Sequence, residues 1–202
     1  RSGTLTMDRT TISESTAVVA GGGISIENEK ISTTITATDT MIQTCSSSQG
    51  QGGAVSVEGK FNLILEDIVL ENNNAYLGGG VYVYSTASFG CANCTIQKNK
   101  AVSDGGGIYA DETSTLTFQN TTLTENDAGR NGGGLYLNKA TGLGVGSAFI
   151  MTPKSAVEDQ LLIAKNKAGV HGGGMFIQQT SHTNSFPGRC EGIHLCGHCP
   201  VD

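Results

Sequence analysis

A glycine-rich motif that recurs six times along the chain limits the possible fold more than any other feature of the sequence. Each copy has three glycines, or two glycines and an alanine in the second copy, followed by an aliphatic residue or methionine, one further residue and a second apolar residue. The copies begin at Gly21, Gly52, Gly78, Gly105, Gly132 and Gly172, so their starts lie 31, 26, 27, 27 and 40 residues apart. Because self-similarity at a period of about 20 to 50 residues is typical of solenoids, we expect a stack of similar coils.

An asparagine forms a second marker that keeps step with the glycine clusters. It lies six residues before four of them, and an aliphatic residue lies three positions before each asparagine. The asparagines are Asn72, Asn99, Asn126 and Asn166, the aliphatic residues are Val69, Ile96, Leu123 and Ile163, and Ile12 and Ser15 hold the same two positions before the first cluster. Amide side chains repeated at one position of stacked coils can hydrogen-bond to one another, so an asparagine ladder is predicted at this corner.

The apolar residues between these markers alternate with polar residues and show no helical period, as at Leu63 and Leu65 or at Leu116 and Phe118. Each period holds three such segments, which predict three short strands per coil. Strands stacked in register would form three parallel sheets around a narrow core, with coils rising by the usual strand spacing of about 4.8 Å. The predicted fold class is therefore all-β, a right-handed parallel β-helix with about 26 to 27 residues per coil.

The glycine clusters fit the corners of such a fold. A sharp corner needs a positive φ or a close approach of two backbones, and glycine permits both at little cost. Beyond each corner the side chains should alternate between core and surface. Two columns are predicted to point into the core, the first made of Ile24, Val55, Val81, Ile108, Leu135 and Met175, and the second of Ile26, Val57, Val83, Ala110, Leu137 and Ile177.

The repeats divide the chain into two regions. Residues 1–181 are predicted to form the β-helix, and the 40-residue interval between the last two clusters implies an insertion at about 141–160. Residues 182–202 form a short cysteine-rich tail, which could be the start of a following cysteine-rich repeat region.

Composition argues against two classes of partner. The net charge is −6 and is spread along the chain, so no basic surface suggests a nucleic acid. No apolar run approaches the roughly 20 residues that a membrane-spanning helix needs, so no membrane span is expected in residues 1–202.

The six cysteines favour disulfides and therefore an oxidising, extracellular location, because their number is even and several are closely spaced. Cys91 and Cys94 both point inward in the predicted register and are expected to form a disulfide at a corner of the helix. The partner of Cys45 is left open.

The cysteines of the tail are expected to be oxidised, with one another or with residues beyond 202. They are Cys190, Cys196 and Cys199. His194 and His198 alternate with them, so zinc binding is the alternative for this segment.

Two N-glycosylation sequons, Asn93-Cys94-Thr95 and Asn120-Thr121-Thr122, agree with a secreted chain. Asn93 and Asn120 each lie twelve residues before a glycine cluster, so they should be outward neighbours on adjacent coils. We expect at least one of them to carry a glycan if the source is eukaryotic.

Aromatic residues form one outward column of the predicted helix. Tyr82, Tyr109, Tyr136 and Phe176 occupy the same outward position in four coils, with Tyr84 nearby. We expect an exposed stripe of rings, which either stabilises the sheet face by about a few tenths to 1 kcal/mol per pair or binds a sugar, the insertion or a neighbouring chain. In the second case, Tyr109→Ser would leave the fold largely intact and weaken association.

This outward column contains no acid and no base, and the carboxylates of the turns are interpreted as solvated loop charges. They are Asp104, Asp111, Glu125 and Asp127. β-Helical polysaccharide lyases and hydrolases need clustered carboxylates together with a Lys or Arg base or a calcium ion. No catalytic residue, metal site or cofactor is therefore predicted. A carbohydrate-active enzyme, with its site on the insertion or outside this segment, is the alternative.

The repeat motifs resemble those of a known family. Glycine clusters such as Gly105-Gly106-Gly107-Ile108, and aliphatic-x-x-Asn tetrads such as the one from Ile96 to Asn99, are similar to the GGA[ILV] and FxxN repeats of the chlamydial-type polymorphic outer-membrane proteins. The resemblance covers roughly residues 10–180, with Ile, Leu or Val where that family has Phe. It implies a β-helix of the kind found in surface proteins. Because a repeat scaffold gains length coil by coil and offers long flat faces for lateral contacts, we expect a non-catalytic, extracellular structural or adhesive segment of a larger assembly or filament, with other protein chains as partners and carbohydrate as a second candidate.

Overall fold

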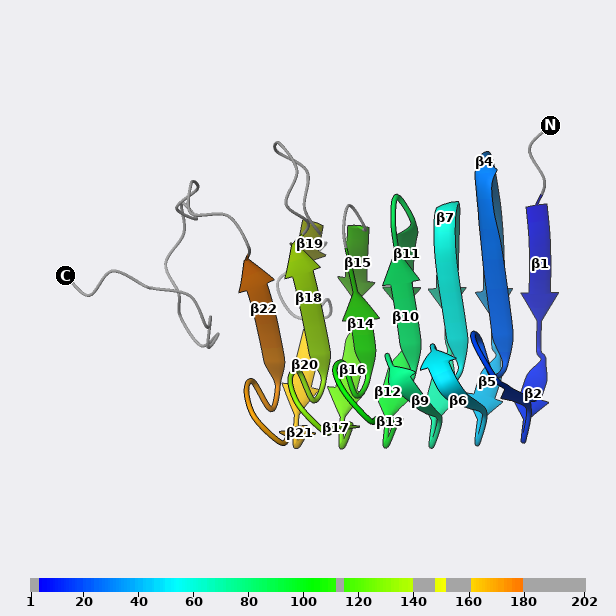
Figure 1. The fold of residues 1–202 in the computed structure, drawn as a ribbon. Coiled ribbons are helices and arrows are strands. Elements are labelled where there is room, and N and C mark those ends of the chain that lie inside the picture. The colour runs from blue at the N-terminus through cyan, green and yellow to red at the C-terminus, as the bar shows by residue number, and fades with distance from the viewer. Residues whose placement is uncertain (1–3, 112–114, 140–147, 152–160, 180–202) are drawn as a thin grey trace.

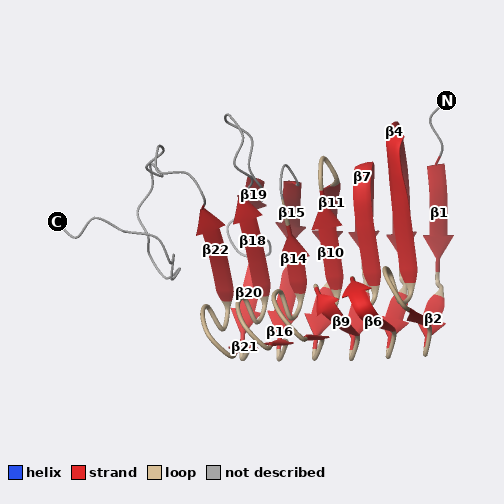
Figure 2. Cartoon of the chain, viewed as in Figure 1, coloured by secondary structure: helices blue, strands red, loops and turns tan. Residues whose placement is uncertain are grey.

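The computed structural model describes residues 4–111, 115–139, 148–151 and 161–179, and within these ranges every regular element is a β-strand (Figure 2). The strands wind into a stack of coils, so that each strand lies beside its counterpart in the next coil (Figure 1). Counterparts pair in parallel and form three sheets. The predicted parallel β-helix with three sheets is confirmed.

The first sheet has ten strands and supplies two faces of each coil. Its strand β7 (Val55–Glu66) pairs through residues 55–58 with one face and through residues 62–66 with the other. Strand β4 (Ile24–Thr38) pairs with β7 along both halves. The later coils of one face are β10 (Val81–Tyr84), β14 (Ile108–Ala110), β18 (Leu135–Lys139) and β22 (Met175–Gln179), and the other face holds β1 (Thr4–Asp8), β11 (Ser88–Ala92), β15 (Thr115–Gln119) and β19 (Ala148–Met151).

The second and third sheets have six short strands each. The second consists of β2 (Thr11–Ser13), β5 (Met41–Gln43), β8 (Val69–Glu71), β12 (Thr95–Gln97), β16 (Thr121–Thr124) and β20 (Leu161–Ala164). The third consists of β3 (Thr16–Ala17), β6 (Ser46–Gln51), β9 (Asn74–Leu77), β13 (Lys100–Ala101), β17 (Asp127–Ala128) and β21 (Lys167–Ala168).

The core is a narrow column of apolar side chains that lies between the sheets. Val81 pairs with Ile108, and Ile108 pairs with Leu135, and all three side chains are fully buried. Leu116 from the opposite face and Ile96 from the second sheet pack into the same cluster. The predicted register is therefore confirmed, and each such side chain contributes about 1.5–3 kcal/mol through its burial.

The glycine clusters make the corners, for both of the predicted reasons. The first glycine of each cluster has a φ between 57° and 70°, a conformation that glycine adopts without strain. The second and third glycines allow close approach to the next coil. A Cβ atom at Gly106 would lie 2.4 Å from the carbonyl oxygen of Gly133, and one at Gly107 would lie 3.1 Å from the Asn126 side chain.

The asparagine ladder is present, and its side-chain hydrogen bonds run continuously through four coils. The backbone N–H and the Nδ2 of Asn99 both donate to Oδ1 of Asn126, at 3.0 Å. The same Nδ2 donates to the carbonyl oxygen of Leu70 in the preceding coil at 2.9 Å. The ladder consists of Asn73, Asn99, Asn126 and Asn166. Because a buried amide without partners costs about 1–3 kcal/mol, this bonding is what makes the buried column tolerable.

One member of the ladder differs from the prediction. Asn73, and not Asn72, occupies the ladder position, and Leu70, and not Val69, enters the core. The cause is a connection to the glycine cluster that is one residue shorter in this coil, so that Asn73 lies five residues before Gly78 where the other ladder members lie six before theirs. Asn72 instead takes the preceding corner with a φ of 56°.

Cys45 occupies the ladder position in the coil before Asn73. Its backbone N–H donates to Oδ1 of Asn73 at 2.9 Å, and its side chain is buried as a free thiol. The thiol lies 3.3 Å from the carbonyl oxygen of Gln43. The question that the sequence left open is thus answered: this cysteine ends the asparagine ladder.

The predicted insertion at about 141–160 is divided by a strand. Residues 148–151 form β19, which pairs in register with β15 from Thr115 onwards. Residues 148–151 of the predicted insertion are therefore part of the sheet. Residues 140–147 and 152–160 lie outside the described residues.

We predict that Cys45→Asn stabilises the protein. The new amide would donate to Oδ1 of Asn73, as each ladder asparagine does to the next, and one such hydrogen bond contributes about 0.5–1.5 kcal/mol. The measurement is the midpoint of urea unfolding, with Cys45→Ala as the control that removes the thiol without adding an amide. An asparagine variant less stable than the alanine variant would show that this position does not accept a ladder amide.

Candidate functional site

The aromatic column of Tyr82, Tyr109, Tyr136 and Phe176, here called the aromatic ladder, is a continuous stack of rings. The residues pair directly from coil to coil. Ring centroids lie 5.3, 4.8 and 5.3 Å apart in that order, with interplanar angles of 15°, 9° and 22°. Near-parallel rings at these separations attract one another beyond simple burial.

The expectation that this ladder is exposed is wrong. Its side chains point away from the core, yet they are only 5–8 % exposed. Each ring covers the face of the next, Leu77 and Tyr84 pack against the cluster, and the ring of His171 stacks on Phe176 at 5.8 Å. The alternation of residues along a strand gives the side of the sheet on which a residue lies, but not what covers it there.

Two tyrosine hydroxyl groups of the ladder donate hydrogen bonds, one to a side chain two residues along the chain and the other to a side chain of the next coil. The hydroxyl of Tyr109 donates to Oδ2 of Asp111 at 3.1 Å, and the hydroxyl of Tyr136 donates to Oε1 of Gln178. Burial, together with the negative charges of Asp104 and Asp111, raises the pKa of Tyr136 to about 12. Burial and then the Asp111 carboxylate raise the pKa of Tyr109 further. Both hydroxyls are therefore neutral donors at physiological pH.

A second polar pair lies beside the aromatic ladder. Oδ1 of Asp104 accepts from the backbone N–H of Asn131 at 3.1 Å and from its Nδ2 at 2.7 Å. Oδ2 of Asp104 accepts from Ser103 at 2.7 Å. The interpretation of Asp104 as a solvated loop charge is wrong, because this residue is only 8 % exposed and its carboxylate is bonded to the next coil. The sequence signal that could have found it is the shared position of Asp104 and Asn131 directly before glycine clusters.

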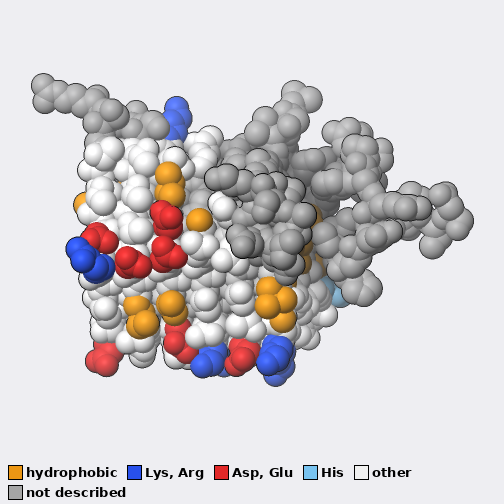
Figure 3. All heavy atoms as spheres, turned by 180° about the vertical axis from the view of Figure 1, so that it is seen from behind, with side chains coloured by type: hydrophobic (Ala, Val, Ile, Leu, Met, Phe, Trp, Pro, Cys, Tyr) orange, Lys and Arg blue, Asp and Glu red, His pale blue; other side chains and the backbone are white. Residues whose placement is uncertain are grey.

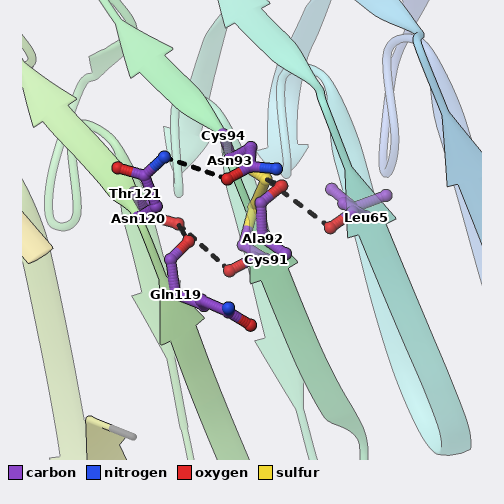
Figure 4. Close-up of a disulfide and its surroundings, with 8 residues drawn as sticks. All are labelled: Leu65, Cys91, Ala92, Asn93, Cys94, Gln119, Asn120 and Thr121. Atoms are coloured by element: carbon purple, nitrogen blue, oxygen red, sulfur yellow. Dashed lines mark hydrogen bonds between the residues drawn. A yellow bond between two sulfur atoms is a disulfide. The ribbon is translucent and has the colours of Figure 1, made fainter. Parts of the chain in front are cut away.

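The predicted disulfide between Cys91 and Cys94 is confirmed (Figure 4). Their Cα atoms lie 5.8 Å apart across a corner, and both side chains are buried in the core. In the next coil Thr121 takes the place of Cys94, and its Oγ1 donates to the carbonyl oxygen of Cys91 at 3.0 Å. The disulfide therefore ties the strand before the corner to the residue after it.

The two sequon asparagines lie side by side at this corner (Figure 4). Nδ2 of Asn120 donates to Oδ1 of Asn93 at 2.9 Å. Both are exposed, and both have a positive φ, 53° at Asn93 and 43° at Asn120. The prediction that they are outward neighbours on adjacent coils is confirmed.

The face seen in Figure 3 carries acidic side chains gathered toward one end of the stack, a row of charges of both signs along its lower edge, and a few hydrophobic side chains on an otherwise uncharged surface. Lys98 bonds to Glu71 of the preceding coil at 2.9 Å, and Arg9 bonds to its neighbour Asp8 at 3.0 Å. Such exposed pairs fix side-chain positions more than they stabilise the fold.

Within the described ranges, no group of three or more His, Cys, Asp or Glu side chains is arranged to hold a metal ion. The same residues include no helix of the length and apolarity that crossing a bilayer requires. The tail cysteines, Cys190, Cys196 and Cys199, lie outside the part of the chain that the structure describes.

We predict that Tyr109→Ser destabilises the protein. The substitution removes a ring that is stacked on both sides, and losses of this kind amount to about 3–5 kcal/mol. The measurement is the free energy of unfolding in urea. Tyr76→Ser is the matched control, because Tyr76 is 48 % exposed and should change stability by less than about 0.5 kcal/mol. Equal stabilities of the two variants would contradict the importance of the stack.

We also predict a loss of stability in alkali that depends on Tyr136. The pKa of an unfolded tyrosine is about 10, and the folded pKa of Tyr136 is about 12. The folded state thus holds the proton more tightly, so this contribution to stability is complete below about pH 10 and is lost as the pH rises to about 12. Tyr136→Phe should reduce that loss, measured as urea midpoints between these pH values. An unchanged pH profile would contradict the prediction.

Comparison with known proteins agrees with this geometry. The family model described as the right-handed beta helix region matches residues 1–199. No curated protein and no solved structure gives a significant match to the chain. The family match extends over nearly all of the sequence, and the structure has the three parallel sheets that the fold requires. The chain belongs to the right-handed beta-helix family.

Proposed function

We propose that the chain is a non-catalytic structural or adhesive segment of an extracellular or cell-surface assembly, in which the β-helix acts as a stiff spacer. The observation that carries the proposal is that side chains of adjacent coils stack on one another or hydrogen-bond to one another along the helix axis. The aromatic ladder, the pair of Asp104 and Asn131, and the pair of Asn93 and Asn120 each connect one coil to the next. Contacts between the side chains of neighbouring coils resist bending of the helix. A repeat scaffold can also gain length coil by coil.

Two features support an extracellular location. The disulfide between Cys91 and Cys94 is of a kind that persists in oxidising compartments. The sequon asparagines, Asn93 and Asn120, are exposed, as acceptors of a glycan must be. We therefore include glycosylation of this corner in the proposal.

The finer family assignment is also part of the proposal. Both markers of the polymorphic outer-membrane repeats have a structural use in this chain, the glycine cluster as a corner and the asparagine as a member of the buried ladder. We propose that the chain is related to those surface proteins, because a resemblance in two separate markers is more specific than a resemblance in either marker alone.

Contacts with other protein chains are proposed at a different place from the aromatic ladder, since the ladder is buried. Large apolar side chains are exposed on β9 and on the turns shortly before later glycine clusters. Tyr76 is 48 % exposed, Val102 is 57 % exposed and Val170 is 59 % exposed. Tyr76 and Val102 lie in adjacent coils, because the N–H of Ser103 donates to the carbonyl oxygen of Tyr76 at 2.9 Å. We propose this edge as the contact surface for neighbouring chains of the assembly, with carbohydrate as a second candidate ligand.

We predict that antibodies against the folded chain label intact, unpermeabilised source cells, or the material that these cells shed. Labelling that appears only after permeabilisation would contradict the extracellular proposal.

A second experiment tests the enzyme alternative. The purified chain is incubated with polyuronides, and the reaction is followed in the ultraviolet, because lyase cleavage creates an absorbing double bond. Release of such a product would favour the alternative of a carbohydrate-active enzyme.

A further inference from the structure

Two glycan acceptor sequences on adjacent coils differ in one covalent feature. The segments around Asn93 and Asn120 have the same local structure, because β11 pairs with β15 before the corner and β12 pairs with β16 after it. Both asparagines are exposed corner residues with a positive φ. Cys91 and Cys94 form a disulfide that encloses Asn93, whereas Phe118 and Thr121 hold the equivalent positions around Asn120.

We propose that closure of the disulfide between Cys91 and Cys94 blocks N-glycosylation of Asn93, so that the redox state of this corner decides how many glycans the protein carries. The inference rests on the proposed passage through a secretory pathway. It goes beyond that proposal because it makes two acceptor sites unequal and names the chemical step that separates them.

The folded corner cannot itself be the substrate of glycan transfer. The hydroxyl-bearing residues of the two sequons, Thr95 and Thr122, are already strand residues, and their backbone N–H groups donate to Ile68 and Cys94 at 2.8 Å. Glycan transfer needs the asparagine and this threonine to bend together in an enzyme's active site. Modification must therefore precede the pairing of these strands, and this condition applies equally to both sites.

Before the strands pair, only Asn93 faces a competing reaction. Cys91 and Cys94 are three residues apart, so closing the ring needs no residue from elsewhere in the chain. The ring can therefore form without the rest of the fold. Its formation oxidises two thiols: both lose their protons, the sulfur–sulfur bond forms, and two electrons pass to a disulfide of an oxidising protein, which is reduced to a dithiol. Asn93 is then held inside a four-residue ring.

Glycan transfer is the other reaction at the same place. Nδ2 of the asparagine forms a bond to the anomeric carbon of a lipid-linked oligosaccharide, the bond from that carbon to the lipid pyrophosphate breaks, and the amide nitrogen loses one proton. It requires an unconstrained sequon. An asparagine enclosed by Cys91 and Cys94 is not free to adopt the required bend, whereas Asn120 remains free until its strands pair.

The test is site occupancy in the full chain, expressed in a eukaryotic secretory host. Occupancy is read at each asparagine by peptide mass after glycosidase treatment in heavy-oxygen water, in the secreted and in the microsomal fractions. The microsomal fraction matters because transfer precedes folding, so a variant that fails to fold still reports. In the chain without substitutions, we expect the glycan occupancy of Asn93 to be at least fivefold below that of Asn120.

Cys91→Ser removes the ring and leaves the sequon intact, and it should raise the occupancy of Asn93 at least threefold without changing that of Asn120. Cys94→Ser, which keeps Asn93 and Thr95, should do the same. Cys45→Ser removes a thiol elsewhere and should have no effect at either site. High occupancy of Asn93 on peptides that contain the intact disulfide would overturn the proposal, as would unchanged occupancy in both ring variants beside an occupied Asn120. Two empty sites in every variant would overturn the glycoprotein proposal as well.

Discussion

Parallel pairing of every strand with its counterpart one coil away is the interaction on which the rest of the structure depends. The pairing continues even through the glycine corners, where the N–H of Val81 donates to Gly107 at 2.9 Å and that of Gly107 donates to Gly133 at 3.0 Å. Because one register holds over successive coils, residues at equivalent positions become stacked neighbours at the strand spacing of about 4.8 Å. Any side chain that the sequence repeats therefore interacts mainly with copies of itself.

The two ladders show what this self-contact demands of a side chain. An amide can donate to one neighbour and accept from another, so Asn99 satisfies both of its groups within the buried column. A tyrosine ring can stack on both faces, so Tyr109 hides its apolar surface on the outside of the helix, and its hydroxyl turns aside to Asp111. The same geometry would be unfavourable for a column of like charges, and Lys98 accordingly meets Glu71 of the coil below.

The corners of Asn93 and Asn120 show how the same register places two similar local structures side by side on adjacent coils. Two neighbouring coils present nearly the same sequon in the same conformation, and only one of them carries a disulfide across it. The structure thus supplies its own control for the effect of the crosslink. Cys45 lies in another part of its coil, where its backbone N–H donates to Asn73 at the end of the asparagine ladder and its thiol is free and buried.

The sequence by itself determined the repeat, the fold class, the core columns and the inward orientation of Cys91 and Cys94. These follow from periodicity and alternation, which are properties of the chain alone. Only the tertiary structure shows that Asn73 holds the ladder position. The connection from this asparagine to its glycine cluster is one residue shorter than for the other ladder asparagines, so counting six residues back from the cluster gives the wrong residue. The burial of Tyr109 and Asp104 also required the tertiary structure, since alternation assigns a side chain to a face, while its exposure depends on neighbours from other coils that only the folded stack brings together.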